Sequence, residues 1–170
     1  MRYKKLLFFL VILVIFTSGC SRKVTEITAP PDNITLDEAT KINLKMLDLN
    51  KLSKTDITQL DGIKFKDNTV GYEMEYRYPD TPIKIKIIKF TSQDEIETFW
   101  LEWLAVHKLE QFKTQQVVEF NQYNNYSSYA WQKGPWFTYI SVPNEPLKDK
   151  VKNVIANHYL NLAKKESLIK

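Results

Sequence analysis

The clearest pattern in the chain is a strict alternation of apolar and polar residues between positions 70 and 87. Apolar or aromatic side chains occupy every second position from Val70 to Tyr78, with Gly, Glu and Arg between them. Isoleucines do the same at positions 83, 85 and 87, with Lys84 and Lys86 between them. A period of two is what a half-buried strand requires. Because Pro79-Asp80-Thr81-Pro82 between the runs is typical of a turn, the pattern predicts a β-hairpin.

Two later segments change to the helical period of three and four. Ser92 and Glu95 have the spacing of a capping box, in which both side chains satisfy backbone N–H groups at a helix start. The residues that follow form one apolar face: Ile96, Phe99, Trp100, Trp103, Leu104 and His107. Pro146 suits the first turn of a last helix. Its apolar stripe is Leu147, Val151, Val154, Ile155, His158 and Leu162.

The segment after Asn33 has two interpretations. Thr35 and Glu38 form another possible capping box, and Ala39, Ile42, Met46 and Leu49 would then share one helical face. The alternation of Ile42, Leu44 and Met46 also suits a strand. Residues 53–62 carry loop signals.

Three further strands complete the expected elements. They are predicted at residues 117–120, 126–132 and 136–142, separated by an Asn-rich segment and by Gly134-Pro135. Strands joined by tight turns run antiparallel, and two amphipathic helices can hide their apolar stripes against one face of such a sheet. The sequence therefore predicts an α+β fold: an antiparallel β-sheet with the amphipathic helices packed on one face, a two-layer sandwich.

The N-terminal segment has the order of features found in export signals. Arg2, Lys4 and Lys5 give it a positive start, and residues 6–16 form eleven uninterrupted apolar positions, too few to cross a bilayer as a helix. Small residues in Thr17-Ser18-Gly19 then precede Cys20, the one cysteine of the chain.

These residues resemble the lipobox of bacterial lipoproteins, although Thr17 stands where leucine is usual. The resemblance covers about 20 residues of the N-terminus. It implies a diacylglyceryl group on the Cys20 thiol, cleavage just before Cys20, and acylation of the new amine. A single cysteine fits this reading, because a thioether to lipid removes a thiol that an exported protein would otherwise leave unpaired. The alternatives are an uncleaved membrane anchor and a conventional signal with an incidental cysteine.

We therefore divide the chain into four parts. Residues 1–19 form the signal peptide, 20–34 the lipidated cysteine and a flexible tether, 35–163 a single domain, and 164–170 a basic C-terminal tail. The expected location is the cell membrane or the outer membrane, with the domain lipid-anchored and exposed outside the cytoplasm.

The net charge of +4 does not indicate nucleic acid. Three of the 24 basic residues lie in the signal, which leaves 24 − 3 = 21 against 20 acidic residues, none of which precedes Cys20. The mature chain is nearly neutral and its charges are interspersed, so no stripe of one sign is available for phosphates. We expect no nucleic-acid partner.

Candidate chemistry is sparse. The single cysteine is assigned to lipid, which removes the thiol nucleophile. His107 and His158 both fall near apolar helical stripes, where a ring with one hydrogen-bonded nitrogen is the usual finding. There is neither a His-x-x-x-His pair for zinc nor a glycine-rich phosphate loop. We therefore expect no catalytic residues, no metal and no cofactor.

Residues 120–139 hold eight aromatic residues among Asn, Gln and Ser. Such rings suit sugars or protein partners, but they also serve as cross-strand pairs over a core. If Lys133 to Pro135 form a three-residue loop, four rings share one side and form the candidate binding face: Tyr129, Trp131, Phe137 and Tyr139. A two-residue loop would instead group Tyr129 and Trp131 with Trp136 and Ile140.

The resulting hypothesis is a membrane-anchored envelope lipoprotein with a noncatalytic binding or accessory domain. Its partners would be the membrane, through Cys20, and an envelope protein or glycan, through the aromatic face. The alternative is an envelope hydrolase that uses paired carboxylates, which could lie anywhere in the chain. Glu73 and Glu75, on a strand's polar face, are first expected to be solvated charges.

Overall fold

The strongest apolar runs of the chain form the centre of one six-stranded sheet. The structure, a computed structural model, describes residues 28–66, 69–79, 81–121 and 126–168. The strands follow the order β1-β4-β5-β8-β7-β6, and all neighbours are antiparallel. Their bounds are β1 Asn50–Ile57, β4 Val70–Tyr78, β5 Thr81–Lys89, β6 Val117–Asn121, β7 Ser127–Lys133 and β8 Trp136–Val142.

Smaller elements and, among the described residues, three α-helices surround this sheet. A two-stranded hairpin, β2 Gln59–Leu60 and β3 Ile63–Lys64, follows β1. The helices are α2 Leu36–Ala39, α3 Gln93–Val106 and α4 Glu145–Ser167, and two 3-10 turns are η1 Lys45–Leu47 and η2 Glu110–Phe112. The predicted α+β class with an antiparallel sheet is confirmed.

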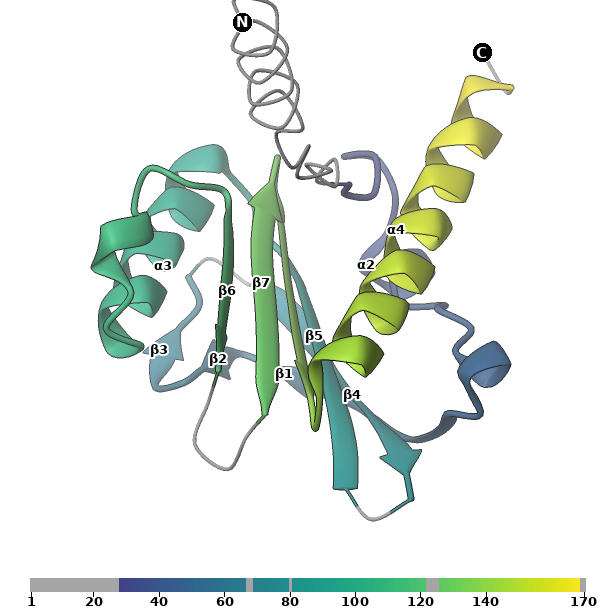
Figure 1. The fold of residues 1–170 in the computed structure, drawn as a ribbon. Helices are drawn as coiled ribbons and strands as arrows, with labels where there is room; N and C mark the ends of the chain where they lie inside the picture. The colour runs from purple at the N-terminus through teal and green to yellow at the C-terminus, as the bar shows by residue number, and fades with distance from the viewer. Residues whose placement is uncertain (1–27, 67–68, 80, 122–125, 169–170) are drawn as a thin grey trace, which may run out of the picture.

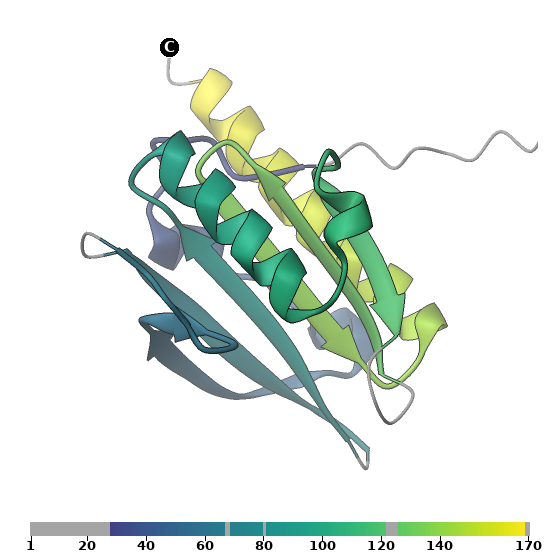
Figure 2. The ribbon, with the colours of Figure 1, turned by 90° about the vertical axis from the view of Figure 1, so that its left-hand side faces the viewer.

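The predicted placement of both long helices on one face is wrong. Figure 2 shows α3 in front of the sheet and α4 behind it. One core cluster joins α3 to Phe137 and Tyr139 of β8, and the other joins α2 and α4 to Trp136 and Ile140 of the same strand. All seven residues of β8 are buried, so the central sheet is apolar on both faces and each face needs its own helix. The result is three layers.

The predicted helix starts are confirmed, although only one of the two predicted capping boxes is reciprocal, because the Glu95 carboxylate accepts from Thr91 N at 3.1 Å instead of from Ser92 N. Thr35 and Glu38 form the reciprocal capping box, with Glu38 N donating to Thr35 Oγ1 at 3.2 Å and Thr35 N donating to Glu38 Oε2 at 3.1 Å. Ser92 accepts from Glu95 N at 3.2 Å and begins α3. Asn144 caps α4, with proline in its first turn as expected.

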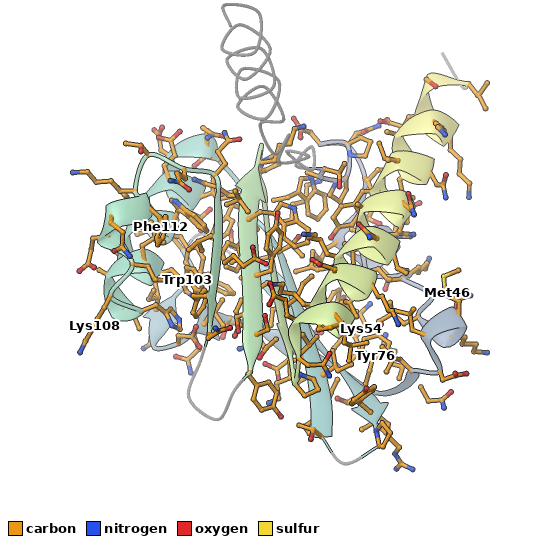
Figure 3. All side chains as sticks on the ribbon, viewed as in Figure 1. Met46, Lys54, Tyr76, Trp103, Lys108 and Phe112 are labelled. Carbon is orange, nitrogen blue, oxygen red and sulfur yellow. The ribbon has the colours of Figure 1, made fainter. Side chains whose placement is uncertain are left out.

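Both ends of the predicted domain need correction. After Ala39 the chain leaves the helix, and Met46 of η1 is 77% exposed instead of sharing a buried face. Figure 3 shows the Met46 side chain at the outer edge of the molecule. Residues 164–167, predicted as a tail, continue α4 to Ser167.

Residues 28–34, predicted as part of a flexible tether, lie against the sheet. Pro30 is buried, and Trp131 Nε1 donates to the carbonyl of Thr28 at 2.8 Å. Lys89 Nζ donates to the carbonyls of Asp32 and Ile34 at 2.5 and 2.8 Å. We call residues 28–34 the docked segment. The folded part of the chain therefore begins at least seven residues before the predicted boundary.

Candidate functional site

The four aromatic residues predicted as a binding face are core residues. Tyr129, Trp131, Phe137 and Tyr139 are 9, 4, 0 and 5% exposed. They also do not share a side of the sheet, because Tyr129 and Trp131 belong to the core cluster under α4, and Phe137 and Tyr139 to the one under α3. The predicted aromatic face is therefore wrong.

The turn between β7 and β8 explains the difference. Lys133 pairs with Trp136, so only Gly134 and Pro135 form the loop. Gly134 has φ of +55°, a backbone conformation that glycine adopts without the strain of a side chain. The two-residue loop places Tyr129 opposite Ile140 and Trp131 opposite Thr138, which was the second register that the sequence allowed. Cys20, the predicted lipidation site, lies outside the described residues.

A polar groove lies at one end of α3, where the helix meets the ends of β6 and β7. It has a volume of about 240 Å³ and includes four glutamines, Gln93 of α3, Gln115 and Gln116 before β6, and Gln132 of β7. We call it the glutamine groove. The backbone joins two of its segments, because Gln132 N donates to the carbonyl of Gln116 at 2.9 Å.

The side-chain amides of this groove are largely unused by the fold. Gln93 Nε2 donates to Glu97 Oε1 at 2.8 Å, one turn along α3. No hydrogen bond joins the side-chain amides of Gln115, Gln116 or Gln132 to another residue that the structure describes. Each amide can donate and accept at the same time, so the groove offers both kinds of partner.

Trp100 borders the same groove and carries an unmet hydrogen-bond donor. It is 1% exposed and stacks on Trp103 at a ring separation of 5.7 Å. Its Nε1 is buried and has no acceptor among the described residues. Leaving such a donor unsatisfied costs about 1–3 kcal/mol, and native structures usually satisfy buried donors with protein, water or ligand. The other indole of this kind, Trp136, lies on the opposite face of the sheet.

A second polar cluster lies where the β2–β3 hairpin meets the C-terminal half of α3. Asp61 Oδ2 accepts from Trp103 Nε1 at 2.9 Å and lies 2.9 Å from His107 Nε2. Lys86 Nζ lies 3.9 Å from Asp61 Oδ1 and 3.3 Å from Glu73 Oε2. Figure 3 shows Trp103 between α3 and the sheet, where it joins these polar groups to the core.

The charge on Asp61 is favoured by this cluster. Burial pushes the pKa of Asp61 upward, but His107, the charge of Lys86 and the Trp103 N–H together outweigh it. The pKa therefore lies below its ordinary value of 3.8. Glu73 is paired with Lys84 and Lys86 at 3.4 and 3.3 Å. The carboxylates of Asp61 and Glu73 are therefore both held in ion pairs. The hydrolase alternative stays a prediction.

The two histidines have the hydrogen bonds that the sequence predicted. His107 contacts Asp61, and His158 Nε2 lies 3.2 Å from the carbonyl oxygen of Glu38. Burial lowers the pKa of His158, which the backbone contacts with Glu38 and Ala39 offset in part. The helices that carry the histidines cover opposite faces of the sheet, so they share no site.

Metal ligands and membrane-spanning helices are two further features that a functional site could involve. Within residues 28–66, 69–79, 81–121 and 126–168, no group of three His, Cys, Asp or Glu side chains could hold a metal ion. No helix in these ranges is long and apolar enough to span a bilayer.

Sequence reasoning missed the glutamine groove. Its four glutamines come from three separate segments, at 93, 115–116 and 132, and no spacing along the chain connects them. The one signal in the sequence was the adjacent pair Gln115-Gln116 just before the strand predicted at 117. That Gln93 and Gln132 lie beside this pair depends on how α3 crosses the sheet, which the sequence pattern does not give.

Comparisons with known proteins give the fold alone. No known family and no curated protein matches the sequence. The chain is similar to a crystal structure from Thermotoga maritima described as a GTP binding regulator, with a TM-score of 0.52 and 14% identity. The similarity covers 76% of this chain and 90% of the other. At this identity the likeness shows that the two proteins share the α+β architecture.

Proposed function

We propose that this protein is a bacterial envelope lipoprotein, anchored to a membrane through Cys20, whose folded domain binds a ligand or partner without catalysing a reaction. The observation that carries the anchor is the order of features in residues 1–20: a basic start, eleven apolar residues, small residues and the chain's single cysteine. The location would be the cell membrane or the outer membrane, with the domain outside the cytoplasm.

The docked segment limits how far an anchored domain could lie from the membrane. The docked segment begins at Thr28, eight residues after Cys20. Eight residues at about 3.3–3.6 Å each span at most roughly 28 Å. An acylated Cys20 would therefore hold the domain close to the bilayer. A cysteine with two or more acyl chains anchors firmly, because each buried methylene contributes about 0.8 kcal/mol.

The binding role is supported by the glutamine groove, which replaces the aromatic face in the proposal. Neutral amides hold a ligand by hydrogen bonds and do not titrate, so they suit recognition more than proton transfer. GTP binding, which describes the Thermotoga protein, is not part of the proposal. The sequence has only four glycines and no glycine-rich phosphate loop.

The anchor is tested by Cys20→Ala, with Ser21→Ala as the matched control. We expect the parent and Ser21→Ala proteins in the membrane fraction, with a mature mass that begins at Cys20 and includes acyl chains. Cys20→Ala should lose the lipid mass, because the chain has no other thiol. Intact-mass spectrometry of the membrane fraction decides it, and an unmodified Cys20 in the parent protein would contradict the proposal.

A further inference from the structure

We propose that the glutamine groove binds an uncharged saccharide, and that an acetamido or hydroxyl oxygen of the sugar accepts the hydrogen bond of Trp100 Nε1. This inference rests on the proposed binding function and names its ligand class. Two independent observations carry it: the concentration of unused amides around one groove, and the buried indole donor without an acceptor among the described residues beside it.

The chemistry of the groove matches sugar hydroxyls. A hydroxyl donates one hydrogen bond and accepts others, and a primary amide does the same through its NH₂ and its carbonyl. Three of the four glutamine side chains are not hydrogen-bonded to a described residue, so binding a sugar breaks no bond that the fold requires. Water can satisfy these exposed amides in the free protein. Trp100 Nε1 is buried in the free protein, so sugar binding requires side chains that border the groove to shift, which opens this donor to a sugar oxygen.

The charge at the groove argues against an ionic ligand. One acidic residue, Glu97, and one basic residue, Lys113, border it, so their charges cancel. A phosphate or nucleotide would require a concentration of positive charge or of backbone N–H groups. The neutral balance favours a ligand that is polar and uncharged.

The size of the groove limits how much of a ligand it takes. Pockets for drug-sized molecules measure roughly 300–1,000 Å³, and this groove has about 240 Å³. It therefore fits one or two sugar rings of a longer chain. We expect a dissociation constant near the millimolar range, because a groove of this size makes few contacts with a ligand.

The test uses the full-length protein in detergent and oligomers of β-1,4-linked N-acetylglucosamine as the probe. The indole N–H resonances of the four tryptophans are followed by NMR during the titration. We expect the Trp100 resonance to move and saturate, while those of Trp131 and Trp136, which lie under α4, stay in place. Gln132→Ala should weaken binding at least tenfold, and Gln111→Ala, an exposed glutamine of η2 outside the groove, should leave it unchanged.

Trp100→Phe removes the N–H donor and keeps an aromatic ring, so it tests the hydrogen bond apart from the packing of the ring. We expect this variant to fold with an unchanged helical spectrum and to bind at least tenfold more weakly. Absence of any Trp100 shift at saturating oligosaccharide, or equal affinity in the parent and Gln132→Ala, would overturn the proposal. A shift caused by an acetylated, amidated tripeptide but by no saccharide would also overturn it, in favour of a peptide ligand. The lipid on Cys20 is measured separately, so failure of the anchor and failure of the saccharide site are distinguishable.

Discussion

Lys148 is a lysine that the fold buries almost completely. Its side chain is 2% exposed in the first turns of α4, where Nζ contacts the carboxylate of Glu119 on β6 and lies 3.8 Å from Glu145 Oε1. Burying a charge costs several kcal/mol, and a carboxylate offsets this only while it stays in place. Glu119 is half exposed, but its carboxylate is needed to offset the cost of burying the Lys148 charge.

This pair leads to a prediction about single substitutions. Glu119→Ala should lower the free energy of unfolding by about 1–3 kcal/mol, because it leaves a buried ammonium without its partner. Lys148→Met should be neutral or stabilising, because methionine fills similar space without the desolvation cost. Urea denaturation measures both. Glu145→Ala is the control and should change stability by less than about 0.5 kcal/mol, and a Lys148→Met variant less stable than Glu119→Ala would contradict the argument.

Among the secondary-structure elements, those with apolar periodicity were predictable. β8 was predicted with its observed bounds, and β4 and α3 to within one residue, because their patterns match one structural period. β1 was missed because it is an edge strand whose residues are mostly exposed, so it shows no alternation. The turn at Gly134 allowed two registers, and the choice between them decided where the aromatic residues lie.

The contact between the β2–β3 hairpin and α3 should depend on pH. Asp61 has a lower pKa folded than unfolded, so its stabilisation is complete above the ordinary value of 3.8 and is lost as pH falls through the lowered folded value. Asp61→Asn should lower stability by about 1–2 kcal/mol at neutral pH. The difference from the parent should shrink as the pH falls below 3.8.

Unfolding in urea at several pH values measures this effect. Asp56→Asn is the control, since Asp56 is an exposed residue of the edge strand β1. Its stability should follow that of the parent protein at every pH. A gap between the parent and Asp61→Asn that stays constant into strong acid would show that the Asp61 charge does not stabilise the hairpin contact.

At the scale of the whole molecule, the docked segment joins the N-terminal chain to the sheet. Figure 1 shows the described chain beginning beside the end of β7, at the same end of the molecule as the C-terminus of α4. Three carbonyls of the docked segment accept hydrogen bonds from Trp131 and Lys89. The sequence predicted a tether here because two prolines and the lack of periodicity indicate an extended chain, and an extended chain can also lie on a surface.

Lys89→Met should release this segment. The substitution removes the donor of two of these hydrogen bonds and keeps much of the aliphatic side chain. We expect faster proteolysis between residues 28 and 34 in the full-length protein and a loss of about 1–2 kcal/mol in unfolding. Lys64→Met, at an exposed position of β3, should leave both unchanged. Equal cleavage rates in the parent and Lys89→Met would mean that Lys89 does not hold the segment.

Docking of residues 28–34 also sets a local concentration. With a lipid on Cys20, the chain from Cys20 to Thr28 can span at most about 28 Å, against roughly 45 Å for a tether that reaches to Asn33. Because the anchor and a membrane-borne ligand both diffuse in the plane of the bilayer, only the thickness of the layer open to the domain changes, so docking raises its effective concentration near the bilayer roughly 1.6-fold. A weak binding site on the domain would then be occupied more often by a ligand carried in the same membrane, without any new contact. Release of the segment would lower that occupancy and leave the intrinsic affinity unchanged.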